Sequence, residues 1–143
     1  SGGRLSENRG GTGREGWSNG PGLNRVSRVG SLWEFRNMLG KSRESTDLFV
    51  LQVVKKNCMA CKAMERKVRR LAQTFPQVKF LELDYAQNEA DCKALGVLML
   101  PHFEVHDALG AKLDGFSCGW NRATVLQEKL EQFISRSRTR DPN

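Results

Sequence analysis

Residues 48–61 read Leu48-Phe-Val-Leu-Gln-Val-Val-Lys-Lys-Asn-Cys58-Met-Ala-Cys61. The first seven form an almost continuous apolar, β-branched run, which is typical of a central strand buried on both faces. Apolar residues then recur at helical spacing from Cys61 to Phe75, and Pro76 ends that pattern. The stretch therefore predicts a buried strand, a short loop and a helix that begins at a pair of cysteines.

A Cys-x-x-Cys pair at such a junction suits dithiol–disulfide chemistry. The N–H groups and partial positive charge of a helix N-terminus stabilise a thiolate at Cys58. Two intervening residues let the sulfurs meet across one helical turn, with Cys58 exposed at the helix mouth and Cys61 covered. We therefore expect Cys58 to attack a partner disulfide and Cys61 to resolve the mixed disulfide.

Two other interpretations of the pair stay open, namely half of a zinc site and two inert packing cysteines. Structural zinc usually takes four ligands from paired motifs. The other cysteines, Cys92 and Cys118, lie 26 residues apart and form no second Cys-x-x-Cys. We expect no metal site and no cofactor.

Positive charge is concentrated beside the cysteines. The chain carries a net charge of +7, and residues 55–70 hold seven basic residues against Glu65, a net +6. We expect Lys55, Lys56 and Lys62 to lower the pKa of Cys58, and the cluster to attract acidic partners. A solvated helix face explains the charge about equally well. The absence of interleaved aromatic residues argues against a nucleic-acid partner.

The rest of the ordered region alternates between strand and helix patterns. The expected strands are residues 26–29, 48–54, 78–83, 102–106 and 111–116. The expected helices run from a Ser31 cap to Gly40, from the cysteine pair to Phe75, over 88–95 and over 124–134. This order predicts an α/β fold whose mixed sheet has helices on both faces, with a late antiparallel hairpin.

The chain ends differ from this region in composition. Eight of the 14 glycines lie in residues 1–24, where few large apolar residues occur, so we expect a flexible N-terminal extension. Residues 25–136 form the predicted domain, and residues 137–143 a basic C-terminal tail. The apolar runs are far shorter than the roughly 20 residues of a membrane-spanning helix, so no membrane span is expected.

A strand, a Cys-x-x-Cys that opens a helix, and Leu100-Pro101 just before a hairpin together resemble the thioredoxin family. The resemblance covers about residues 25–136. It implies a mixed central sheet of about five strands flanked by about four helices. It also implies a cis bond before Pro101, which leaves the backbone of Leu100 free to pair with a bound substrate strand.

A subgroup, the atypical Cys/His-rich thioredoxins of chloroplasts, is similar in four stretches. These are Cys58-Met-Ala-Cys61-Lys-Ala, Gln77-Val-Lys-Phe-Leu-Glu-Leu-Asp-Tyr85, Cys92-Lys-Ala-Leu-Gly-Val-Leu-Met-Leu-Pro101-His-Phe and Phe116-Ser-Cys118. The resemblance implies a thiol oxidoreductase of the chloroplast stroma that exchanges electrons with 2-Cys peroxiredoxins and redox-regulated metabolic enzymes. It also makes Cys92 and Cys118 candidate regulatory thiols; the alternative, that both are packing residues or bystanders, is favoured because free cysteines are often simply buried.

Three departures from the thioredoxin pattern surround the pair: Asn57 replaces Trp, Met59-Ala60 replaces Gly-Pro, and Gln52 replaces a buried Asp. That Asp is thought to help deprotonate the resolving cysteine, so its loss should slow release of the mixed disulfide. We expect a reduction potential less negative than the roughly −270 mV of thioredoxin. The same departures allow an alternative function, a weakly catalytic or non-catalytic subunit of a larger complex that holds residues 1–24.

Overall fold

A five-stranded sheet in the order β1-β3-β2-β4-β5 forms the centre of the computed structural model, which describes residues 25–41 and 46–140. The strands are β1 (Val26–Val29), β2 (Leu48–Val54), β3 (Val78–Asp84), β4 (His102–Asp107) and β5 (Lys112–Ser117). The first three pair in parallel, β4 is antiparallel to β2, and β5 is antiparallel to β4. The mixed sheet expected from the sequence is confirmed.

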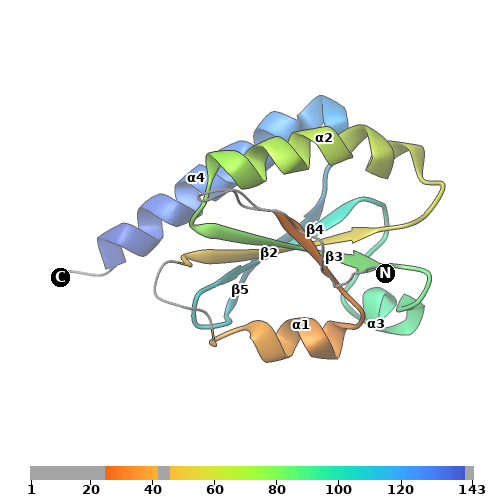
Figure 1. Cartoon of the computed structure of the whole chain (residues 1–143), viewed down its shortest axis with the longest axis horizontal. Helices are drawn as coiled ribbons and strands as arrows, with labels where there is room; N and C mark the ends of the chain where they lie inside the picture. Colours follow the sequence, from red (N-terminus) through yellow and green to blue (C-terminus); the bar gives the residue numbers. More distant parts are fainter. Residues whose placement is uncertain (1–24, 42–45, 141–143) are drawn as a thin grey trace.

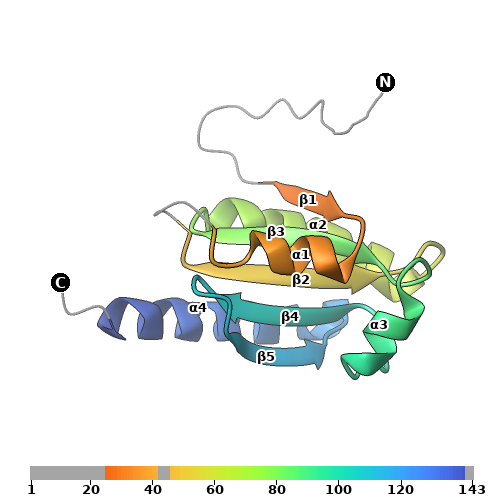
Figure 2. The same ribbon diagram turned by 90° about the horizontal axis from the view of Figure 1, so that it is seen from below.

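Helices cover both faces of this sheet. They are α1 (Leu32–Met38), α2 (Met59–Thr74), α3 (Glu89–Ala94) and α4 (Ala123–Arg140), with a 3-10 turn at Trp120–Arg122. Figure 1 shows α2 and α4 on one side of the strands and α1 and α3 on the other. Figure 2, turned by 90°, places α1 in front of the sheet and α4 behind it.

Local sequence signals explain where the helices begin. Ser31 caps α1, because its Oγ accepts a hydrogen bond from the backbone N–H of Glu34 at 3.0 Å. In turn, Glu34 Oε1 accepts from the N–H of Gly30 at 2.8 Å. Helix α2 ends at Thr74 with Phe75 as its C-cap, immediately before Pro76, close to the end that the sequence predicts.

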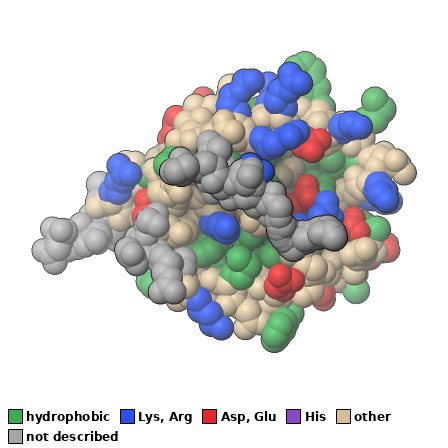
Figure 3. Space-filling view, in the orientation of Figure 1, with side chains coloured by type: hydrophobic (Ala, Val, Ile, Leu, Met, Phe, Trp, Pro, Cys, Tyr) green, Lys and Arg blue, Asp and Glu red, His purple; other side chains and the backbone are tan. Residues whose placement is uncertain are grey.

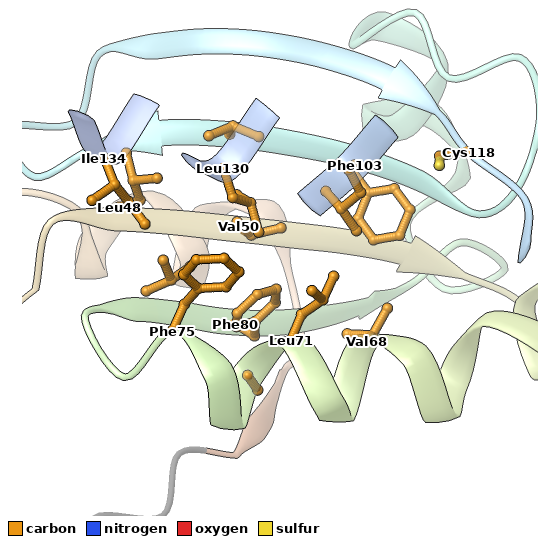
Figure 4. Close-up of a cluster of buried hydrophobic side chains, with 14 of the residues drawn as sticks. Leu48, Val50, Val68, Leu71, Phe75, Phe80, Phe103, Cys118, Leu130 and Ile134 are labelled. Atoms are coloured by element: carbon orange, nitrogen blue, oxygen red, sulfur yellow. The ribbon is translucent and has the colours of Figure 1, made fainter. Parts of the chain in front are cut away.

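Two apolar clusters hold the layers together, one on each face of the sheet. Under α2 and α4, the inward side chains of β2 and β3 pack against helix residues such as Leu71 and Leu130 (Figure 4). Under α1 and α3, a second cluster gathers around Leu51, Leu81 and Cys92. Full burial of one such side chain contributes roughly 1.5–3 kcal/mol, so the sheet is fixed firmly between its helices.

The structure differs from the sequence-based expectations at some ends. Helix α4 continues to Arg140, past residue 134 and into the segment predicted as a tail. The basic run that follows Ile134 contains no helix breaker before Pro142, which accounts for the extra turns. Strand β5 begins and ends one residue later than expected. The predicted extension, residues 1–24, lies outside the described residues.

Candidate active site

The cysteine pair lies at the N-terminus of α2, where the chain leaves the central strand β2. Cys58 is the N-cap residue of α2, and Cys61 lies in its first turn. Between strand and helix, Asn57 has a φ of 65°. Asparagine tolerates this left-handed conformation better than most residues, so its presence suits the sharp turn that delivers Cys58 to the helix.

The two thiols have different surroundings. Cys58 is half-buried, whereas Cys61 is only 6% exposed. The backbone N–H of Cys61 donates a hydrogen bond to Cys58 Sγ at 3.2 Å. Burial raises the pKa of Cys61 to about 12, and the hydrogen bond with Cys58 adds to this shift. The arrangement therefore pairs an accessible sulfur with a covered thiol that holds its proton tightly.

A surface cavity of about 870 Å³ opens beside the pair. Both cysteines line it, and so do the three lysines singled out from the sequence, Lys55, Lys56 and Lys62. Figure 3 shows further Lys and Arg side chains gathered over the part of the surface where α2 lies. The effect of the three lysines on the reactivity of Cys58 stays a prediction.

Three further side chains on the cavity wall come from neighbouring strands: Arg28 on β1, Glu82 on β3 and Gln52 on β2. Glu82 is the register partner of both Arg28 and Gln52. Neither Glu82 nor Arg28 is among the site residues expected from the sequence. The parity of β3 could have revealed Glu82, since it continues the alternation of Val78 and Phe80 on the face that α2 covers.

The Leu100–Pro101 peptide bond is cis. Pro101 is buried and precedes β4, whose first residue, His102, pairs with Val53 near the end of β2. The loop that carries Cys58 leaves β2 just after that point, so Pro101 and the dithiol lie at the same end of the sheet. Leu100 packs partly buried against the cluster under α1 and α3. A substrate-binding role for these two residues stays a prediction.

The two additional cysteines are buried on opposite faces of the sheet. Cys92 on α3 belongs to the cluster under α1 and α3, and Cys118 to the cluster under α2 and α4. Cys118 Sγ donates a hydrogen bond to the carbonyl of Arg122 at 3.0 Å. Burial raises the pKa of both thiols. These surroundings favour the packing interpretation, and a regulatory role stays a prediction.

A second group of charged residues lies on β4 and β5, away from the dithiol cavity. Glu104 is 1% exposed, and its carboxylate lies 2.7 Å from His102 Nε2 and 3.0 Å from Lys112 Nζ. His106 also faces it, at 3.8 Å. Although burial alone would raise the pKa of Glu104, the hydrogen bond with His102 and the nearby His106 and Lys112 side chains lower it to about 2. Glu104 therefore stays ionised inside the domain.

Across residues 25–41 and 46–140, no group of three or more His, Cys, Asp and Glu side chains is placed to hold a metal ion. No helix in this part of the chain has the length and apolar character needed to cross a membrane.

Two solved structures have a fold like that of this chain and are similar to it in sequence. The thioredoxin of Trypanosoma brucei brucei is 28% identical, with a TM-score of 0.67 over 85% of this chain and 99% of its own. Thioredoxin f from spinach chloroplast is 25% identical, with a TM-score of 0.62 over 84% of this chain and 99% of its own.

Curated plant relatives match by sequence. Thioredoxin-like 2, chloroplastic, of Oryza sativa subsp. japonica is 27% identical over 80% of this chain and 51% of its own length. Thioredoxin-like 1-2, chloroplastic, of Arabidopsis thaliana is 34% identical over 62% of this chain and 36% of its own. The chain thus spans about half or less of the length of these relatives.

The family model described as thioredoxin matches residues 31–132, which include the whole of the cavity-lining α2 and the cis proline. Fold, dithiol placement and sequence agree. The chain belongs to the thioredoxin family.

Proposed function

We propose that the chain is a thiol–disulfide oxidoreductase in which Cys58 is the nucleophile and Cys61 the resolving thiol. The observation that carries the proposal is their asymmetry, since Cys58 is the half-buried cap of α2 and Cys61 lies buried one turn further on. A thiolate at Cys58 gains from the N–H of Cys61 and from the positive end of the helix.

The reaction has two steps. The Cys58 thiolate attacks one sulfur of a partner disulfide, forms a mixed disulfide and releases the other partner sulfur as a thiolate. Cys61 then loses its proton and attacks Cys58 Sγ, which forms the Cys58–Cys61 disulfide and releases the second partner thiolate. The partner disulfide is reduced to two thiols, and the dithiol of the chain is oxidised.

The proposed partners are protein disulfides, specifically those of 2-Cys peroxiredoxins and redox-regulated metabolic enzymes of the chloroplast stroma. The chloroplastic names of the plant relatives and the positive cavity rim support this assignment. Leu100 and Pro101 are proposed to receive the extended partner segment at the end of the sheet. The neutral Gln52 supports a reduction potential less negative than the roughly −270 mV of thioredoxin.

The direct test is insulin reduction driven by dithiothreitol. We expect turnover with the native chain, none above background with Cys58→Ser, and turnover retained with Cys92→Ala as the matched cysteine control. Cys61→Ser should trap partners from chloroplast stroma as mixed disulfides on Cys58. Background activity in every variant, with no trapped partner, would refute the oxidoreductase function and favour the subunit of a larger complex.

A further inference from the structure

The thioredoxin pattern has a carboxylate on the central strand, at the position that Gln52 occupies here. In this chain, the cavity beside the dithiol has a carboxylate on the neighbouring strand β3, at Glu82. Three residues lie side by side across neighbouring strands, as the strand registers show: Arg28 on β1, Glu82 on β3 and Gln52 on β2. They share the parity of Val78 and Phe80, so they extend the face covered by α2 towards the N-terminus of that helix. The acidic group of this row is Glu82, and the central strand carries an amide.

Glu82 is partly buried and pairs closely with Arg28 among the residues that the structure describes. Its side chain is 25% exposed, and its Oε1 lies 2.7 Å from Arg28 Nη2. The Arg28 side chain of this pair is 66% exposed to solvent. Glu82 and Cys61 line the same cavity, Glu82 from β3 and Cys61 from α2.

The second step of the proposed reaction requires a base. Because burial raises the pKa of Cys61 to about 12, very little of this thiol is ionised at pH 7. Gln52 has no basic group. Burial raises the pKa of Glu82, although Arg28 opposes the shift, and a carboxylate with a raised pKa is a stronger base near neutral pH. The charge of Glu82 also acts on Cys61 across the cavity and raises the pKa of that thiol.

We propose that Glu82 accepts the proton of Cys61 when Cys61 attacks the mixed disulfide on Cys58, and that Arg28 sets the pH range in which it does so. The inference rests on the proposed oxidoreductase function. In the step, the Cys61 S–H proton passes to the Glu82 carboxylate and the Cys61–Cys58 bond forms. The bond from Cys58 to the partner sulfur breaks, and the partner leaves with the electron pair.

Other charged groups also face the cavity and have to be distinguished from Glu82. Lys55 and Lys56 come from the loop before α2, and Lys62 and Glu65 from α2 itself. Asp84 lies two residues further along β3 and lines the same cavity. The change Asp84→Asn therefore provides a matched control, because it removes one carboxylate from the same strand and cavity.

The experiment uses one equivalent of the aromatic disulfide 5,5′-dithiobis(2-nitrobenzoate). Attack by Cys58 releases one thionitrobenzoate, and attack by Cys61 releases the second, so stopped-flow absorbance separates the two steps without any physiological partner. Thionitrobenzoate leaves readily as a thiolate, and the second rate therefore reports the deprotonation of Cys61. Each variant is followed across pH 5–10, with thermal unfolding as the check on folding.

In the native chain, the second rate should rise as Glu82 ionises, reach a plateau, and rise again where Cys61 ionises without help. Glu82→Gln should slow the second release roughly tenfold or more at pH 7. It should also abolish the lower rise, that is, the increase of the second rate that occurs at the lower pH. Asp84→Asn should stay within about twofold and keep the lower rise. The first release should change little in any of these variants.

Arg28→Gln provides a second, independent test of Glu82, because the Arg28 side chain is exposed and its loss should leave the fold intact. Removing the guanidinium raises the pKa of Glu82, so the lower rise should move to higher pH. A native pH profile in both Glu82→Gln and Arg28→Gln would overturn the role of Glu82 while leaving the oxidoreductase function in place. Release of only one thionitrobenzoate by the native chain would refute the dithiol function itself.

Discussion

The backbone N–H of Cys61 donates a hydrogen bond to the Sγ of Cys58 over 3.2 Å. One thiol of the pair thus caps the helix that buries the other. The helix terminus stabilises negative charge at Cys58, while the first turn of the same helix keeps Cys61 covered and protonated.

The burial of the cysteines predicts a selective alkylation pattern. All four cysteines lie in the described part of the chain, where Cys58 is half-buried and the other three are buried. Iodoacetamide at pH 7 should therefore label Cys58 at least about tenfold faster than any other thiol, because the thiolate reacts and access limits the rest. Peptide mass spectrometry over time measures this. Cys58→Ser should remove the fast adduct, and fast labelling of Cys92 or Cys118 would contradict the structure.

The buried Glu104 predicts a loss of stability in acid. Its pKa of about 2 in the folded domain lies below the ordinary value of 4.5, so its contribution is fully present above about pH 4.5 and is lost as the pH falls towards 2. The size of that contribution is on the order of 3 kcal/mol. Urea unfolding of the native chain and of Glu104→Gln at pH 7 and pH 3 should give free-energy differences that shrink in acid.

Glu89→Gln is the control for this prediction, because Glu89 is an exposed glutamate that pairs with Lys93 on α3. It should leave the free energy of unfolding nearly unchanged at both pH values. A difference between the native chain and Glu104→Gln that does not depend on pH would show that Glu104 acts through packing alone.

The same buried carboxylate predicts that an alanine at Gly115 is poorly tolerated. Gly115 is the register partner of Glu104, and a Cβ there would lie 2.7 Å from Glu104 Oε2 and 3.1 Å from Lys112 Cε. We expect Gly115→Ala to cost about 1–3 kcal/mol through overpacking, measured by chemical denaturation. At Gly119 the nearest atom would be 3.4 Å away, so Gly119→Ala should cost much less. Equal losses in the two variants would contradict the steric explanation.

The positive φ of Asn57 predicts how substitutions at this position in the loop before the dithiol change the stability of the domain. At a φ of 65°, a β-branched residue is strained and glycine is not. Asn57→Val should lower the free energy of unfolding by about 1–2 kcal/mol, whereas Asn57→Gly should be close to neutral. Thermal unfolding gives both values. The neighbouring exposed Lys56→Val serves as the control, and a comparable loss there would assign the effect to the valine itself.

Most of the fold follows from local sequence signals. The apolar run of β2, the Ser31 cap and the proline after Phe75 each determine an element boundary within its own neighbourhood, and the structure places those boundaries as predicted. The position of Cys58 at the start of α2 was predictable for the same reason. The extra length of α4 was not, because a basic segment without an apolar face shows no periodicity.

The chemistry around the pair was less predictable because it depends on strand register. The position of Gln52 itself carries no acid, although the neighbouring strand supplies Glu82 as its register partner. In the same way, only the antiparallel pairing of β4 and β5 shows Lys112 beside the Glu104 carboxylate that His102 contacts. Side-by-side contacts between distant segments carry no local sequence signature.

The sheet also separates Glu82 from Glu104. In the pairing of β2 with β4, Leu51 stands opposite Glu104 and Gln52 opposite Phe103, so Glu82 and Glu104 point to opposite faces. Effects of substitutions at well-separated sites add. Substitutions on one face of this sheet should therefore change thiol–disulfide exchange, and substitutions on the other face should change stability in acid. The two properties of this small domain can be altered independently of each other.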